Sequence, residues 1–180
     1  MPSLPFPPDV EKSDNLRKMI AEAPELGAYA EKPLGEHGVN IEGLAVRNHH
    51  LFLGFRAPVL DGKAFVMSVD VDAVFGNAPA GPHVYSIALG DGVGVRDLVA
   101  VEGGFLVLGG PEMDEPGAAK LFFWAGQSTA PKRLGRLAGL PEGAKPEAVL
   151  VLAEDTEAYR LLIMSDGIAG GAPMEYRVPK

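Results

Sequence analysis

Residues 95–110 read VRDLVAVEGGFLVLGG. This stretch contains two short apolar runs, Val95–Val101 and Phe105–Gly110, separated by the turn Glu102-Gly103-Gly104. Apolar runs of roughly four to eight residues on either side of a glycine turn are typical of a β-hairpin. Residues 95–110 therefore predict two antiparallel strands, and the rest of the chain can be compared with this pattern.

Similar runs occur on both sides of this hairpin. Residues 41–46, 51–56, 63–71 and 83–89 precede it, the run at 120–124 belongs to its own unit, and residues 145–152, 159–164 and 174–178 follow. The matching acidic residues Glu42, Asp97 and Glu147 are 55 and 50 positions apart. A period of about 50 residues with three or four strands in each unit is typical of β-propeller blades. A β-sandwich with similar hairpins is the alternative.

The sequence thus predicts an all-β, propeller-like fold of about three blades, each with three to four antiparallel strands. The units are expected at about 38–90, 91–140 and 141–180, after an N-terminal arm over 1–37. One short amphipathic helix is expected at about 14–23, because Ser13 and Asp14 suit a helix start and Leu16, Met19 and Ile20 recur at helical spacing. Ten residues at matching strand positions are expected to be buried: Leu44, Val46, Leu51, Leu53, Leu98, Phe105, Val107, Val149, Val151 and Leu162.

Three blades raise the question of closure, because closed propellers have roughly four to eight blades. An open fan leaves two uncovered ends, which invite pairing with another chain. We therefore expect self-association, most simply as a dimer that forms a six-bladed ring.

Composition and charge exclude several classes of partner. The chain of 180 residues is 47% hydrophobic and 22% charged, as expected of a globular protein. Its net charge of −8, without a lysine- or arginine-rich stretch, argues against binding nucleic acid or an anionic membrane. The first residues lack a basic head followed by an apolar run, so no signal peptide and a cytoplasmic location are expected, although the absence of cysteine leaves the compartment open.

Several segments together resemble a known family: Asn40–Val46, Gly54–Gly62, Gly94–Leu98, Gly109–Pro111 and Lys145–Ala148. They are similar to the bacterial family catalogued as domain of unknown function 3616, from about Asn15 to the C-terminus. The resemblance is to the C-terminal half of typical members, which carry further propeller-like repeats upstream. It implies a propeller-like fold, carries no established activity, and suggests a distant likeness to phytase-like and other metal-dependent propeller hydrolases.

Charged residues recur at the first strand of each unit, which lines the channel of a propeller. Glu42, Asp97 and Glu147 are expected to converge at one channel mouth, where carboxylates repel one another unless a cation neutralises them. They are candidate ligands for Ca²⁺ or Mg²⁺. Arg56, Arg96 and Lys145 are candidate ligand-binding residues, because such side chains can hold a phosphate or carboxylate. Alternatively, these charges pair with one another and only fix how the blades pack.

We interpret the chain as a domain that binds a small ligand or divalent cation at the channel mouth. One alternative is a metal-dependent hydrolase of a phosphoester or lactone, and another is an interaction scaffold without a small-molecule site. Whether it is an enzyme is left open by the sequence, which has no G-x-S-x-G motif. His49-His50 is interpreted as a solvated turn, and Asp70 and Asp72 as outward strand positions.

Overall fold

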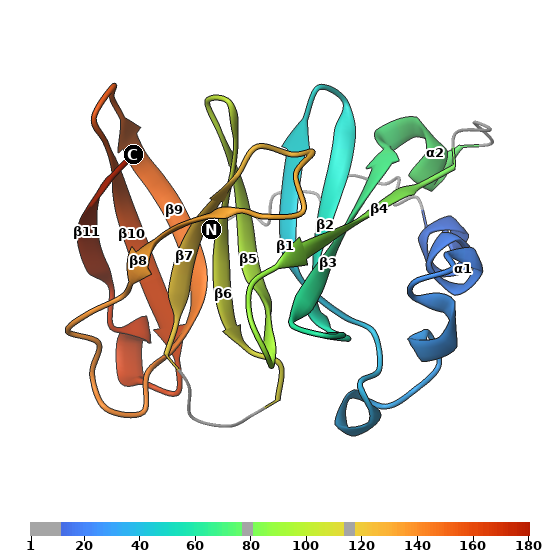
Figure 1. The fold of residues 1–180 in the computed structure, drawn as a ribbon, viewed down its shortest axis with the longest axis horizontal. Coiled ribbons are helices and arrows are strands. Elements are labelled where there is room, and N and C mark those ends of the chain that lie inside the picture. Colours follow the sequence, from blue (N-terminus) through green and yellow to red (C-terminus); the bar gives the residue numbers. More distant parts are fainter. Residues whose placement is uncertain (1–11, 77–80, 114–117) are drawn as a thin grey trace, which may run out of the picture.

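A computed structural model describes residues 12–76, 81–113 and 118–180 of the chain. Three antiparallel sheets stand side by side like the blades of a fan (Figure 1). Blade 1 consists of β1 (Asn40–Arg47), β2 (His50–Ala57), β3 (Lys63–Asp70) and β4 (His83–Ala88). Blade 2 consists of β5 (Val93–Val101), β6 (Gly104–Pro111), β7 (Lys120–Trp124) and β8 (Lys132–Arg136). Blade 3 consists of β9 (Lys145–Glu154), β10 (Ala158–Asp166) and β11 (Met174–Pro179).

The predicted all-β, propeller-like class is confirmed, with sheets of four, four and three strands. Two elements differ from the prediction. The strand β8 was not expected, because its sequence KRLGR lacks an apolar pattern. The strand expected at 63–71 ends at Asp70, where the short helix α2 (Val71–Phe75) begins, because the Asp70 carboxylate accepts a hydrogen bond from the Asp72 backbone N–H at 2.8 Å.

The N-terminal helix α1 (Asn15–Glu22) covers part of the outer face of blade 1 and confirms the helix expected at about 14–23. Ile20 and Leu26 are buried against Phe55 and other apolar residues of β2 and β3. The Ser13 hydroxyl donates a hydrogen bond to the Val74 carbonyl, which ties the start of α1 to α2. Short 3-10 turns occur at Gly27–Tyr29, Leu34–Glu36 and Ala169–Gly171. None of the helices in the described ranges is long and apolar enough to cross a membrane.

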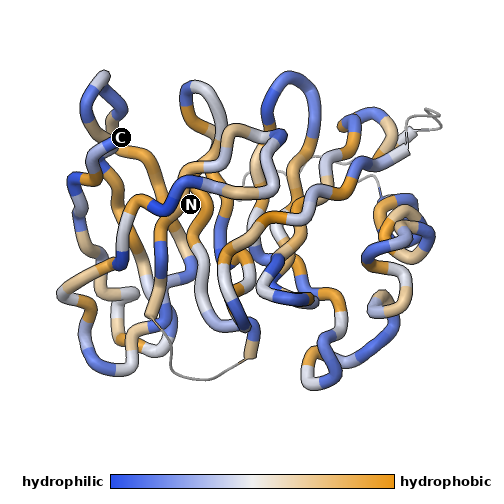
Figure 2. Tube along the Cα trace, viewed as in Figure 1, coloured by the Kyte–Doolittle hydropathy of each residue, from blue (hydrophilic) through white to orange (hydrophobic). Residues whose placement is uncertain are grey.

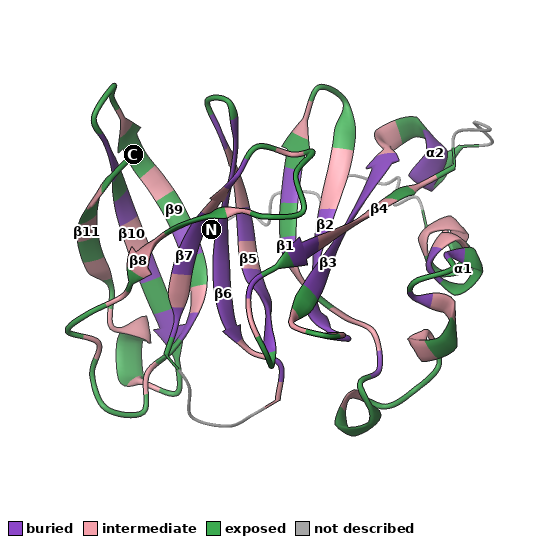
Figure 3. Ribbon diagram, in the orientation of Figure 1, coloured by how far each residue is buried: buried purple, intermediate pink, exposed green. Residues whose placement is uncertain are grey.

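Blade 2 is buried on both faces. Towards blade 1, Val95, Leu98 and Phe105 pack with Val66 and Ile87, while Leu106 and Leu108 pack towards blade 3. Figure 3 shows β6 as almost entirely buried, whereas the strands of blade 3 contain exposed residues among buried ones. Apolar residues follow the strands and hydrophilic ones gather at the hairpin tips (Figure 2). The core therefore consists of two layers, one on each side of blade 2.

A pair of glycines allows β5 to approach blade 1 closely. Gly43 and Gly54 lie opposite each other in β1 and β2. A Cβ atom on Gly54 would lie 2.4 Å from Cγ1 of Val95, which is far below van der Waals contact. These two positions therefore exclude larger residues where the innermost strands meet.

The expected core is partly confirmed. Leu53, Leu98, Phe105, Val107 and Val149 are buried, whereas Leu51, Val151 and Leu162 are only partly buried. The prediction was wrong for Leu44 and Val46, which are 58% and 59% exposed. Gly43 faces blade 2, so its neighbour Leu44 points away from it, where the strand has no blade beside it. These two residues lie in a strand as expected, but the neighbour that would cover them is not part of the described fold.

The matched pair Leu98 and Leu44 tests this assignment of faces. Leu98→Ala is expected to lower the free energy of unfolding by about 2–5 kcal/mol, because it leaves a cavity between blades 1 and 2. Leu44→Ala is expected to lower that of the monomeric chain by less than about 1 kcal/mol, because the side chain is exposed there. Urea unfolding of both variants, at a protein concentration where the chain is monomeric, measures the difference. Equal losses would contradict the assignment.

Candidate functional site

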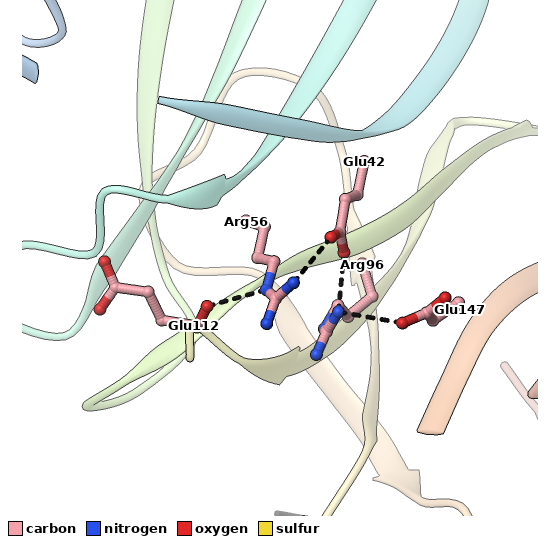
Figure 4. A network of polar contacts seen from close by, with 5 residues as sticks. All are labelled: Glu42, Arg56, Arg96, Glu112 and Glu147. Atoms are coloured by element: carbon pink, nitrogen blue, oxygen red, sulfur yellow. Dashed lines mark hydrogen bonds and ion pairs between the residues drawn. The ribbon is translucent and has the colours of Figure 1, made fainter. Parts of the chain in front are cut away.

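Each innermost strand has an irregularity at the same place. The pairing of β1 with β2, β5 with β6 and β9 with β10 skips one residue, which is Glu42, Arg96 and Glu147, respectively. Such a β-bulge bends the strand and redirects the side chain of the extra residue. In Figure 4 these three side chains turn towards one another. The bulges thus bring together groups from three blades.

The three residues form ion pairs together with Arg56 of β2. Nη1 of Arg96 donates to Oε2 of Glu42 at 3.0 Å and to Oε1 of Glu147 at 3.2 Å. Nη1 of Arg56 donates to Oε1 of Glu42 at 3.1 Å, and its Nε donates to the backbone carbonyl of Glu112 at 2.8 Å (Figure 4). We call Glu42, Arg56, Arg96 and Glu147 the inner-strand network.

Burial differs between the two signs of charge in this network. The Arg56 and Arg96 side chains are only 6% and 4% exposed, whereas those of Glu42 and Glu147 are 22% and 38% exposed. A buried guanidinium loses its hydration and needs carboxylate partners, which the two glutamates supply. The network therefore presents carboxylate oxygens rather than guanidinium groups to solvent. An anionic ligand of Arg56 and Arg96 would have to displace these carboxylates.

Asp97 lies apart from this network in its contacts. Its Oδ1 accepts a hydrogen bond from the Leu98 backbone N–H at 2.8 Å, and its Oδ2 accepts one from the Val149 N–H at 2.7 Å. Val149 belongs to β9, so the Asp97 carboxylate links blade 2 to blade 3. Of the three acidic residues proposed from the sequence, the structure joins Glu42 and Glu147 through Arg96, and it places the Asp97 carboxylate on backbone amides. A metal-binding role for the three stays a prediction.

Two further groups complete this region. Lys145 begins β9 opposite Asp166, and its side chain is exposed. Glu112, which the sequence did not single out, is buried, and its Oε1 accepts from the Val59 N–H and lies 2.9 Å from Nδ1 of His37. These partners are 53 and 75 positions away in the chain, so no local pattern could have indicated them.

A second cluster lies at the turn between β1 and β2. Within the ranges that the structure describes, His49, Asp70 and Asp72 are the group of potential metal ligands whose atoms lie within 4.8 Å of one another. Nε2 of His49 is 3.3 Å from Oδ2 of Asp72, and both side chains are largely exposed. His49 has the positive φ of a tight hairpin turn, as the solvated-turn interpretation requires. The sequence did not predict that the two aspartates would meet this turn.

The pKa of Asp97 leads to a testable pH dependence. Burial raises this pKa above the ordinary value of 3.8, against the opposing effect of the two N–H donors. A carboxyl whose folded pKa is raised stabilises the fold fully below the unfolded pKa and loses that contribution as pH rises through the folded pKa. The advantage of wild type over Asp97→Asn, which keeps only one acceptor oxygen, should therefore be largest below pH 3.8 and shrink as the pH rises through the raised pKa. Urea unfolding at a series of pH values below and above 3.8 measures it, and an advantage that grows with pH would contradict it.

Comparison with known proteins assigns the chain to a family. Neither the curated proteins nor the solved structures contain a significant match to it. One family model does match, described as protein of unknown function (DUF3616), and the match covers residues 8–171. Because it spans most of the 180 residues, β1 to β10 and all four members of the inner-strand network lie within the matched region, and β11 follows it. The chain belongs to the DUF3616 family of proteins of unknown function.

Proposed function

We propose that the chain is a propeller-like scaffold that functions by assembly, and that its partner is a second copy of itself. The observation that supports this proposal is a pair of exposed apolar strips, one at each end of the fan. The β1 strip consists of Ile41, Leu44 and Val46, and the β9–β10 strip consists of Leu150, Leu152 and Met164. These six side chains account for all but one of the large exposed apolar residues in the described ranges.

Both strips lie on blade faces that are exposed at the ends of the fan. The equivalent faces within the fan are covered by a neighbouring blade. Leu44 is two residues after the bulge residue of β1, just as Leu98 and Val149 are two residues after those of β5 and β9. Leu98 and Val149 are buried because a preceding blade packs on them. Leu150 follows Val149 and points to the other side of blade 3. A blade that packed on either strip would therefore extend an existing kind of interface.

On both end blades, the outer strands are either already covered or polar. A partner is therefore expected to contact the innermost strands. On blade 1, α1 already covers β2 and β3, so only the β1 strip is left apolar and exposed. On blade 3, the outer strands carry the exposed ion pair of Arg160 and Glu175, with Nε and Oε1 2.9 Å apart. A partner that covers both strips would bring apolar inner strands together and leave polar groups at the rim, as stable interfaces do.

A second copy meets both requirements at once. Under two-fold symmetry, the β9–β10 strip of each copy would pack on the β1 strip of the other, so one contact is made twice. The result is a ring of six blades, within the range of about four to eight that closed propellers adopt. Removing apolar area from water at both joins supplies the driving force.

Mass in solution tests the assembly. Light scattering at micromolar concentration should give twice the 18.9 kDa of one chain. Leu44→Asp and Leu150→Asp should each yield a folded monomer, because a carboxylate buried at the join loses its hydration. Phe75→Asp is the matched control, since Phe75 is exposed but lies outside both strips. A monomeric wild type, or a dimer that both strip variants leave intact, would refute the proposal.

A second candidate function is the binding of a divalent cation or small ligand at the inner-strand network. The partly exposed carboxylates of Glu42 and Glu147 favour a cation over an anion there. The hydrolase alternative depends on this same site, because its metal would have to polarise the scissile group.

Thermal unfolding tests this second candidate. Ca²⁺ or Mg²⁺ should raise the melting temperature of wild type, and chelator should reverse the rise. At a free cation concentration of a hundred times the dissociation constant, the folded state gains about 2.7 kcal/mol. Glu147→Gln should abolish the response, whereas Glu142→Gln, in an exposed loop, should keep it. If wild type does not respond to either cation, the network only holds the blades together.

A further inference from the structure

A cleft lies between blades 1 and 2, near the turn that joins β1 to β2, and is separate from the inner-strand network. Its volume is about 540 Å³, which suits a small organic molecule. The aromatic side chains Phe52, Tyr85 and Phe105 line it, together with polar side chains at its opening. We call this space the aromatic cleft.

The aromatic cleft exists because small residues stand where the two blades would otherwise fill the gap. Val66 of β3 is fully buried between the blades, but two residues further along the same face the side chain is Ser68. On the side of blade 2, Ala125 and Gly126 follow β7 and line the same space. Gly126 has a φ of 88°, which favours glycine there. The inter-blade core therefore ends at this level and leaves an open space.

The rings that line the cleft belong to a larger aromatic array. The Phe52 and Phe105 centroids are 4.5 Å apart, and Trp124 lies behind them, 5.4 Å from Phe105 and 5.1 Å from Tyr85. Phe52 and Tyr85 are only partly buried, so the array reaches the cleft. A planar ring that entered would extend these stacked and edge-to-face contacts at little conformational cost.

The polar groups at the opening include one permanent cation and several side chains that can donate hydrogen bonds. The Arg47 guanidinium lies over the Phe105 ring at 5.6 Å from its centroid, which holds a positive charge beside the aromatic surface. His50 and His83 add two imidazoles, and the His83 ring lies 4.3 Å from that of Tyr85. Among the described residues that line the cleft, Asp70 is the one carboxylate. The opening thus offers cationic or donor groups next to an aromatic floor.

We infer that the aromatic cleft binds a planar aromatic molecule that carries one anionic group. The ring stacks on Phe52 and Tyr85, and the anionic group pairs with Arg47. A neutral sugar satisfies the polar opening but gains less from the array of rings and nothing from the charge on Arg47. The site is independent of the assembly proposed above, since none of its lining residues belongs to either apolar strip.

The only tryptophan of the chain allows a direct test. Trp124 is fully buried directly behind the aromatic floor, so a ring bound in the cleft should change its fluorescence. Adenosine monophosphate is the probe, and adenosine, ribose 5-phosphate and maltose are compared with it by titration calorimetry. Adenosine monophosphate should bind several-fold more tightly than adenosine, and the other two should not bind. Binding of maltose alone, or of none of the four, would overturn the inference.

Three variants locate the site. Ala125→Phe should abolish binding by filling the cleft, without loss of stability, because Ala125 is exposed. Arg47→Gln should reduce the affinity for adenosine monophosphate to that for adenosine. Arg133→Gln, an exposed arginine of β8 outside the cleft, should bind as wild type does. Wild-type affinity in both Ala125→Phe and Arg47→Gln would show that the probe binds elsewhere.

Discussion

The burial of β5 on both faces is the constraint on which the rest of the structure depends. Val95 and Leu98 pack on blade 1, and Val101 packs towards blade 3 from the opposite face of the strand. A sheet with two apolar faces needs a neighbouring layer on each face. Blade 2 therefore determines that blades 1 and 3 pack on its opposite sides. The end blades have no such double cover at their innermost strands, and this explains why both apolar strips lie there.

The polar groups of β5 follow from the same position. Arg96 is buried between the blades and must find carboxylates, and it finds one on each side, in Glu42 and Glu147. Asp97 likewise uses a backbone amide of β9. Buried ion pairs of this kind add little net stability, because desolvation offsets most of the attraction. Their effect here is to define which strands can be neighbours, since a misplaced blade would leave a buried charge without its partner.

Local sequence predicted most elements, and the exceptions have physical reasons. The hairpins and α1 could be read because apolar spacing and glycine turns are local features. The strand β8 could not, because KRLGR forms a strand by pairing with the edge of β7 rather than through its own apolar pattern. The exposure of Leu44 could not be predicted either, because a residue at a correct strand position is buried only if a neighbouring blade covers it.

The sequence by itself determined the strand-rich fold, the number of blades and the recurrence of charged residues at the first strand of each. Only the tertiary structure decided that Arg96, and not Asp97, stands between Glu42 and Glu147. A bulge in β5 sets this difference, because it turns one residue out of the pairing with β6 and leaves the next to the amides of Leu98 and Val149. Bulges arise from how strands pair across the sheet, and the amide of Val149 is 52 positions from Asp97 in the chain. The spacing of residues along the sequence therefore could not predict the bulge or this hydrogen bond.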